Sequence, residues 1–213
     1  MREKIVFGTA AGALIAMAAI AYLSCENAFA GSVLFAFGLL TIVNYNFQLF
    51  TGVVGYTCVQ KSKKELLRYS LFSMNVWFWN LVGAMLVGYA LSHTRTYAKI
   101  YPKLEALMQS KCSDSPSSLF ILGIFCGILM FIAVNTYKKT EAAPIVKTVL
   151  LFACVVVFIL SGYEHCVANM AYIALYQKFD MGIITILLFS TLGNIVGCNL
   201  PAIPMSMSFK TKK

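Results

Sequence analysis

The sequence predicts an all-α membrane protein, a single transmembrane channel domain of six helices over residues 1–213. Two observations support this fold class. Hydrophobic residues make up 60% of the chain and charged residues only 12%, well under the quarter that is usual for soluble domains. The hydrophobic residues also come in runs near or above the ~20 residues that a helix needs to cross a bilayer. A soluble fold is therefore excluded.

The runs define six expected spans, at residues 5–23, 30–59, 67–92, 118–137, 144–176 and 181–207. The first is longer than the ~7–15 residues of a signal peptide's apolar core, so we expect a retained helix. Of the 17 lysines and arginines, 12 fall on the side of the N-terminus and 5 on the other. This asymmetry predicts cytoplasmic termini, and we expect the protein in the plasma membrane.

The second and fifth spans are too long for straight helices. Phe29 to Val59 and Ala143 to Tyr176 each exceed 30 residues, which would rise ~45 Å through a ~30 Å hydrocarbon core. Each run holds a place for a break, QLFTG at 48–52 and SGYEH at 161–165. Backbone freed from a helix at membrane depth must be buried in protein or line a cavity. We therefore expect both helices to be interrupted at a site.

A weak internal repeat supports the two breaks. NLVG at 80–83 is echoed by NIVG at 194–197, and Thr51 precedes Asn80 by the same 29 residues that separate His165 from Asn194. Because each half holds three spans, the halves must be inverted relative to each other. Inverted halves with paired broken helices place a permeation site near the midplane.

Several segments together resemble the formate–nitrite transporter family. SGYEHCVANM is similar to its fifth-helix signature, FQLFTG to its second, and WNLVGAML and LGNIVG to its third and sixth. ILGIFCGILMFIAV resembles the fourth helix, and GTAAGALIAMAAI the first. The resemblance implies a homopentamer of six-helix, aquaporin-like pores for small monovalent anions such as formate, nitrite, hydrosulfide or lactate. Gln48 departs from the acidic residue usual at its position, and Phe189 from a frequent proline.

His165 is the main candidate site residue. An ionisable side chain inside a span is costly and marks a functional site by default. His165 would either donate a hydrogen bond to a passing anion or supply a proton, so that the neutral acid crosses. The alternative is a structural histidine between helices. Equal spacing makes Thr51 its partner, as an anion donor or as the cap of a half-helix starting near Val53, whose free N–H groups would add a positive end.

The other candidates have supporting roles. Glu164 is expected to point away from the pore and to accept backbone N–H bonds. Phe158 lies two helical turns before His165, so it is expected to narrow the pore on the same face. Asn80, Asn169 and Asn194 are expected to be buried amides that tie helices together or satisfy broken backbone, and Asn194 is also expected to line the pore. Constriction is predicted by Leu39 and Phe35 on the face of Thr51 and by Phe50. For the loop residue Lys111, the resemblance implies an anion-attracting role in the vestibule.

The predicted function is a channel or proton-coupled pathway for a small monovalent anion. A neutral-solute channel for water or ammonia on the same architecture is the alternative. An enzyme is disfavoured because the chain has no second histidine within a span, no metal-ligand cluster and no glycine-rich cofactor loop. We expect no cofactor and no metal. Nucleic acid is not an expected partner, because the basic residues stand in short blocks between apolar runs, as they do in the loops of membrane proteins.

Overall fold

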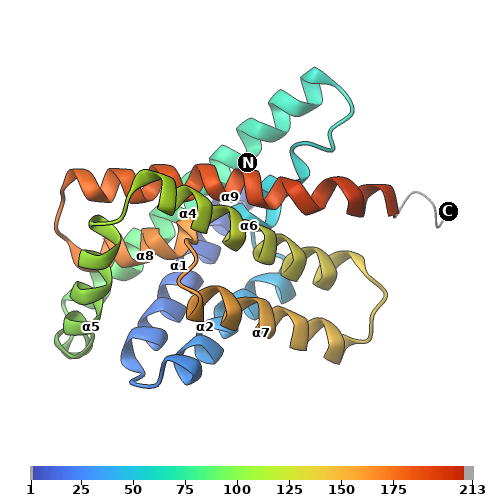
Figure 1. The fold of residues 1–213 in the computed structure, drawn as a ribbon. Helices are drawn as coiled ribbons and strands as arrows, with labels where there is room; N and C mark the ends of the chain where they lie inside the picture. The colour runs from blue at the N-terminus through green and yellow to red at the C-terminus, as the bar shows by residue number, and fades with distance from the viewer. Residues whose placement is uncertain (1, 209–213) are drawn as a thin grey trace.

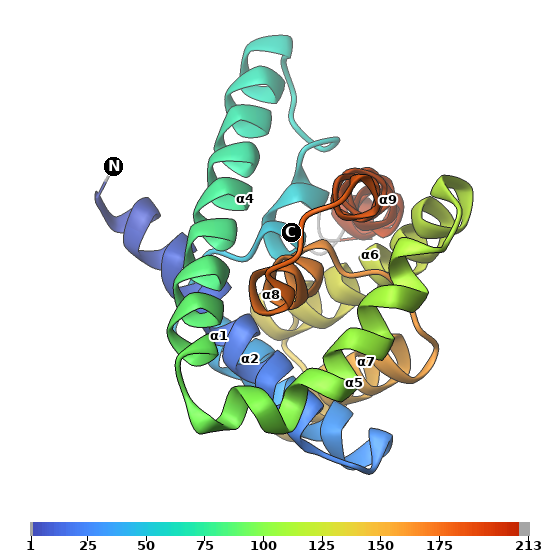
Figure 2. The same ribbon diagram turned by 90° about the vertical axis from the view of Figure 1, so that its left-hand side faces the viewer.

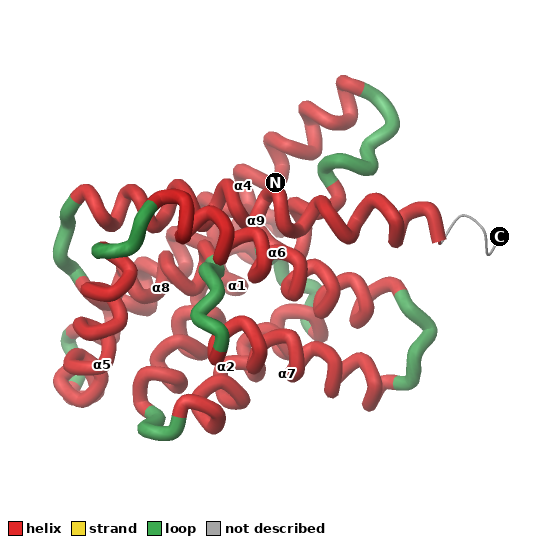
Figure 3. The backbone as a smooth tube through the Cα atoms, in the orientation of Figure 1, coloured by secondary structure: helices red, strands yellow, loops and turns green. Residues whose placement is uncertain are grey.

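The computed structural model describes residues 2–208, which form nine α-helices and one short 3-10 helix (Figures 1 and 3). The elements are α1 (Arg2–Ser24), α2 (Ala28–Asn44), α3 (Phe50–Val53), η1 (Val54–Tyr56), α4 (Lys63–Ser92), α5 (Arg95–Cys112), α6 (Pro116–Lys139), α7 (Pro144–Leu160), α8 (Cys166–Tyr176) and α9 (Met181–Ser208).

The helices have the lengths and the outer surface of a membrane protein. Four segments are long and apolar enough to cross a bilayer: Ile5–Ser24, Lys63–Ser92, Pro116–Lys139 and Met181–Pro204. Large apolar side chains cover the outside, among them Phe37, Leu86 and Leu188, each exposed over half of its surface or more. An apolar exterior of this kind suits lipid rather than water. The protein is therefore an integral membrane protein.

Two close helix pairs frame the bundle, α1 with α4 and α6 with α9. Glycine permits the close approach in each pair. A Cβ added to Gly83 would lie 2.0 Å from the carbonyl oxygen of Thr9, and one added to Gly197 would lie 2.1 Å from that of Ile124. Small residues of this kind let helix backbones meet in membranes. In Figure 2, α8 and α9 are seen nearly end-on, and α8 lies in the middle of the bundle.

The chain leaves the helical conformation in the middle of two apolar runs. Helix α2 ends at Asn44 and α3 begins at Phe50, while α7 ends at Leu160 and α8 begins at Cys166. The second gap is the predicted 161–165. The first gap lies earlier than the predicted 48–52, and the helix restarts at Phe50 rather than near Val53. The prediction erred because the apolar residues Leu49 and Phe50 do not show which of them begins the helix.

Helix α5 is a structural element that the sequence analysis missed. The segment between the third and fourth spans was expected to be a loop, but Arg95–Cys112 is helical. Its buried residues Ile100, Leu104 and Met108 are four apart and share one face. That spacing is the signal that would have predicted it. Lys111 therefore lies in the last turn of a helix and not in a loop.

Candidate functional site between two helix breaks

The two breaks meet in the protein interior through Thr51 and His165. The Thr51 hydroxyl oxygen lies 3.0 Å from Nε2 of His165, and the two residues are 0% and 2% exposed. Thr51 belongs to the first turn of α3, and His165 is the residue that precedes α8. The fold thus brings together two polar side chains that are 114 positions apart in the chain.

The neighbouring backbone determines which nitrogen of His165 can carry a proton. His165 is the N-cap of α8, and its Nδ1 accepts the backbone N–H of Ala168 at 3.0 Å. A nitrogen that accepts a hydrogen bond carries no proton, so the neutral ring holds its proton on Nε2. Nε2 then donates to the Thr51 oxygen. The Thr51 hydroxyl is left as a donor, since no other partner is found for it among the described residues.

Asparagine side chains hold both restarted helices in place. Asn80 accepts the N–H of Phe50 at 2.9 Å and donates to the carbonyls of Gly8 and Gln48. These three bonds bind the start of α3 to α1 and α4. The first backbone donor of α3 is thereby occupied, and the N–H of Gly52 binds the carbonyl of Leu49 at 2.9 Å.

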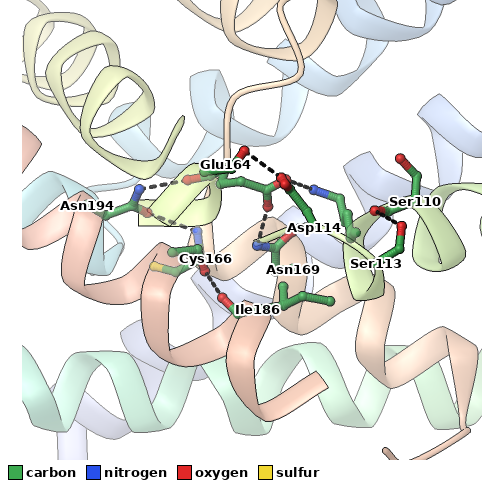
Figure 4. A network of polar contacts seen from close by, with 11 residues as sticks. Ser110, Ser113, Asp114, Glu164, Cys166, Asn169, Ile186 and Asn194 are labelled. Atoms are coloured by element: carbon green, nitrogen blue, oxygen red, sulfur yellow. Dashed lines mark hydrogen bonds and ion pairs between the residues drawn. The ribbon is translucent and has the colours of Figure 1, made fainter. Parts of the chain in front are cut away.

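Asn194 does the same at the start of α8. It accepts the N–H of Cys166 at 2.9 Å and donates to the carbonyl of Glu164 (Figure 4). It also donates to the carbonyl of Gly123. Both amide hydrogens are used by backbone oxygens. Asn194 was predicted both to line the pore and to satisfy the backbone of a broken helix, and its side chain makes these backbone contacts.

The hydrogen bonds also correct the register of the repeat. Phe50 and Cys166 bind equivalent asparagines, and Leu49 and His165 both precede a restarted helix in extended conformation. These pairs are 116 residues apart, not the 114 that separate Thr51 from His165. The equivalent of His165 is therefore Leu49. Thr51 precedes Asn80 by as many residues as His165 precedes Asn194, and this equal spacing predicted that Thr51 and His165 are partners. It did not identify which residues occupy equivalent positions in the two halves.

A buried ion pair lies next to His165. Lys111 Nζ is 2.5 Å from Glu164 Oε1, and the side chains are 12% and 4% exposed. The other carboxylate oxygen of Glu164 accepts a bond of 2.7 Å from Nδ2 of Asn169 (Figure 4). The carboxylate was expected to accept backbone N–H groups. It binds two side chains instead, because Asn194 and His165 already occupy the donors at the start of α8.

A recess of about 50 Å³ lies on the α5 side of His165, where there is room for a small solute. Its wall is formed by α5, α7, α8 and the end of α1, and it includes His165, Phe158, Lys111 and Asn169. Two tyrosines of this wall, Tyr22 and Tyr172, were not predicted from the sequence. No motif identified them, because they come from helices that only the fold brings together.

A second recess, of about 10 Å³, lies beside the other break. Its lining residues are Ile42, Val43, Phe47, Leu49, Gly52, Val53, Val134 and Lys138. Each of the first six lies 116 positions before a residue that lines the larger recess, which is the separation of equivalent positions in the two halves. The two hollows are thus equivalent places in the two halves.

The predicted constriction residues are buried close to this site. The rings of Phe35 and Phe158 meet edge to face with centroids 5.7 Å apart, and Phe158 is also 5.7 Å from the His165 ring. Leu39 and Phe50 are 1% and 0% exposed. Phe35 and Leu39 lie in α2, which ends at Asn44, so helical spacing does not place them on the face of Thr51. Helix α7 likewise ends at Leu160, so Phe158 and His165 are not on one continuous helix.

The described residues do not form a centre for a metal. No group of three or more histidine, cysteine, aspartate or glutamate side chains is close enough to hold an ion within the part of the chain that the structure describes. Most buried polar groups of the site bind one another or backbone, and Oδ1 of Asn169 is without a partner among the described residues. Hydrogen bonding to a small solute is the chemistry that this site supports.

A polar pair between two broken helices, inside a bundle with an apolar exterior, defines a polytopic membrane transport protein. Residues 1–205 match the family described as formate/nitrite transporter, and the chain belongs to this family.

Relatives and solved structures agree with this assignment. The chain is 30% identical to the uncharacterized transporter YwcJ of Bacillus subtilis, over 78% of this chain and 69% of YwcJ. It is 26% identical to the nitrite transporter NirC of Escherichia coli, over 66% of this chain and about half (53%) of NirC. A pentameric formate channel with formate bound has the same fold, with a TM-score of 0.79 at 23% identity over 100% of this chain and 98% of that one.

Proposed function

We propose that this protein is a membrane channel for a small monovalent anion of a weak acid, such as formate, nitrite or hydrosulfide. The observation that carries the proposal is the buried contact between Thr51 and His165, which lies between two recesses in a bundle whose interior is mostly apolar. The names of the relatives, a nitrite transporter and a formate channel, point to the same class of solute.

The proposed architecture has six spans in two inverted halves of three. Helices α2 and α7 are shorter than a span, and each is followed after five residues by a further helix. We assign α2 with α3 and η1 as the interrupted second span, and α7 with α8 as the interrupted fifth. By the positive-inside rule both termini are cytoplasmic. Assembly as a homopentamer follows the pentameric formate channel that shares this fold.

In the proposed mechanism, His165 and Thr51 replace part of the anion's hydration shell. The anion reaches them past Phe158 and Phe35 on one side, and past Leu49 and the adjoining Phe50 on the other. The Nε2–H of His165 and the hydroxyl of Thr51 are both donors, the type of group that an anion needs where water is excluded. When the pore is empty, the Nε2–H of His165 binds the Thr51 oxygen, and the hydroxyl hydrogen of Thr51 is the donor left for an arriving anion.

Proton transfer from His165 to the anion is a more specific proposal. It carries an energetic cost, because His165 also caps the N-terminus of α8. A doubly protonated ring would place a hydrogen on Nδ1, facing the N–H of Ala168, and would lose the 3.0 Å cap bond. Donation by the neutral ring keeps this bond. The structure therefore favours a hydrogen-bonding histidine, and proton coupling requires α8 to shift at its start.

The test is uptake of radiolabelled formate into liposomes that contain the purified protein, compared with nitrite, hydrosulfide, water and ammonia. Saturable anion uptake by the wild type is expected. We expect His165→Ala to lower it about 10- to 100-fold, because a hydrogen bond to a charged group contributes about 1.5–3 kcal/mol. Passage of water or ammonia without any anion would support the neutral-solute channel instead.

The pH profile of the same assay separates the two roles of His165. If the ring only donates a hydrogen bond, His165→Ala lowers flux at every pH and leaves the shape of the profile unchanged. If it delivers a proton, the variant loses the rise of flux towards acid pH. His165→Gln, which keeps one donor, is the matched variant and should retain more flux than His165→Ala.

A further inference from the structure

Two tyrosine rings form part of the wall of the larger recess. Tyr22 comes from the last turn of α1, and Tyr172 from the second half of α8. Tyr172 is only 6% exposed, and Tyr22 is partly buried. The rings therefore stand inside the protein, on the same recess as His165 and Phe158.

Lysines of α5 hold both rings in place. Nζ of Lys103 donates to the backbone carbonyls of Tyr22 and Cys25 at 3.0 and 2.7 Å, and lies 4.2 Å from the centroid of the Tyr22 ring. Nζ of Lys111, which is bound to Glu164, lies 6.0 Å from the centroid of the Tyr172 ring. A cation is attracted to the face of an aromatic ring. Fixed rings can exclude a solute that a mobile wall would admit.

The size of the recess sets a limit on what can lie beside His165. Phe158 packs edge to face on Phe35, and His165 caps α8, so this part of the wall is fixed as well. The recess holds about 50 Å³. A water-sized group needs ~10–15 Å³ of such space, so there is room for about three to five non-hydrogen atoms. Hydrosulfide has one such atom, formate and nitrite have three, and lactate has six.

We propose that Tyr22 and Tyr172 are specificity-determining residues, whose rings admit formate, nitrite and hydrosulfide to His165 and exclude lactate. To reach the Nε2–H of His165, lactate would have to displace a ring that α5 holds in place. A mismatch of one methylene against an apolar wall already changes discrimination about 10- to 200-fold. This inference rests on the proposed function as an anion channel and narrows its solutes by size.

The experiment measures the ratio of lactate uptake to formate uptake in liposomes, after subtraction of uptake by protein-free liposomes. We expect the ratio to rise about tenfold in Tyr22→Leu and in Tyr172→Leu, the lower end of the effect of one methylene. Because both solutes are measured on the same preparation, a smaller fraction of folded channels does not alter the ratio.

Two controls separate size from other causes. Tyr172→Phe keeps the ring and removes the hydroxyl, so it should keep the wild-type ratio. Tyr89→Leu changes an exposed tyrosine of α4 that does not line the recess, and it should also keep that ratio. An unchanged ratio in both Tyr22→Leu and Tyr172→Leu overturns the inference, as does an equal rise in Tyr89→Leu.

A change in the opposite direction tests the same wall without removing a ring. Leu107 of α5 also lines the recess, and Leu107→Phe adds volume there. Formate uptake should fall about tenfold relative to hydrosulfide uptake, because the smaller ion still fits. An unchanged ratio of formate to hydrosulfide would show that the recess does not limit the size of the solute.

The assay also distinguishes failure of this inference from failure of the proposed function. If the wild type moves lactate as well as formate, the size limit is wrong and the anion channel stands. If the wild type moves none of formate, nitrite and hydrosulfide, the anion channel itself is wrong, and the role of the two tyrosines is rejected with it.

Discussion

The break before α3 and the break before α8 have the same backbone plan and different side chains. Each contains one residue with positive φ, Asn46 at 54° and Gly162 at 67°, and each ends in an extended N-cap residue. An asparagine from a neighbouring helix binds the first N–H after each break. At the N-cap itself, one half has Leu49 and the other has His165.

The difference continues around the two recesses. Glu164 and Asn169 in the second half stand where the first half has Gln48 and Val53. The first half contributes one polar group to the centre, Thr51, whose equivalent in the second half is Val167. The comparison teaches that the same broken-helix backbone can carry different side-chain chemistry. In each half one asparagine holds this backbone conformation in place, and a few different residues give the second half its ionisable groups.

The largest effect is expected from removing an asparagine clamp. Asn194→Ala leaves the N–H of Cys166 buried and unpaired and removes two bonds to the carbonyls of Gly123 and Glu164. The unpaired N–H costs about 1–3 kcal/mol and each lost bond about 0.5–1.5 kcal/mol, so we expect a loss of about 2–6 kcal/mol and a large fall in the unfolding temperature in detergent. If the plan is truly shared, Asn80→Ala should cost the same within about 1 kcal/mol.

The control for the clamps is Asn44→Ala, which removes an exposed asparagine from the end of α2. Its unfolding temperature should lie close to that of the wild type. The comparison of the two halves would be broken if Asn194→Ala were destabilised and Asn80→Ala were as stable as Asn44→Ala.

The next effect is expected from making the second half resemble the first with Glu164→Gln. This change leaves the Lys111 ammonium, with a side chain only 12% exposed, without its counter-charge. Breaking a buried ion pair from one side costs about 3 kcal/mol or more. The double variant Glu164→Gln/Lys111→Met should regain most of that stability, measured as a double-mutant cycle. A single variant as stable as wild type would show that the pair is solvated in the membrane-embedded protein.

A smaller effect, on transport rather than stability, is expected from giving the first half the residue of the second. Thr51→Val keeps the shape of the side chain and removes the hydroxyl that accepts from His165 and donates to the anion. We expect formate flux to fall about tenfold, the effect of losing about 1.4 kcal/mol. Thr51→Ser should keep flux within about threefold of wild type. Undiminished flux in Thr51→Val would remove Thr51 from the proposed site.

The smallest effect is expected at the second ion pair of the second half, Lys178 with Glu105. They are 2.7 Å apart, but their side chains are 53% and 34% exposed, unlike the buried Lys111 and Glu164. The hydrogen bond from Lys178 lowers the pKa of the Glu105 carboxyl, and the same bond raises the pKa of Lys178. Water screens an exposed pair, so Glu105→Gln should change the unfolding temperature by no more than about 1–2 °C.

The pH dependence of this pair follows from the two directions. The lowered pKa of Glu105 gives a contribution that is present above the unfolded value of ~4.3 and is lost as pH falls through the folded value. The raised pKa of Lys178 gives one that is present below ~10.4 and is lost as pH rises through its folded value. Any difference in unfolding temperature between Glu105→Gln and wild type should therefore be confined to the pH range between these two limits. A difference that grows at pH 3 would contradict the pairing.

The sequence alone determined the features that follow from runs and from single exceptional residues. Apolar runs longer than a bilayer is thick indicated membrane spans and two helices that had to break, and the polar SGYEH placed the second break at 161–165. His165 and Glu164 stood out because ionisable groups are costly in such a run. Each of these properties can be read from a few neighbouring residues, without knowing what packs against them.

Only the tertiary structure decided the contacts between distant segments. Three of these contacts join residues at least 28 positions apart. They are the bond from Phe50 to Asn80 at the start of α3, the bond from Cys166 to Asn194 and the pairing of Glu164 with Lys111. Equal spacing placed Thr51 opposite His165, but the equivalent of His165 is Leu49, because the hydrogen bonds of the two asparagines set the register. A pattern along the chain shows where a helix must break, and the groups that then satisfy its freed backbone are chosen by packing.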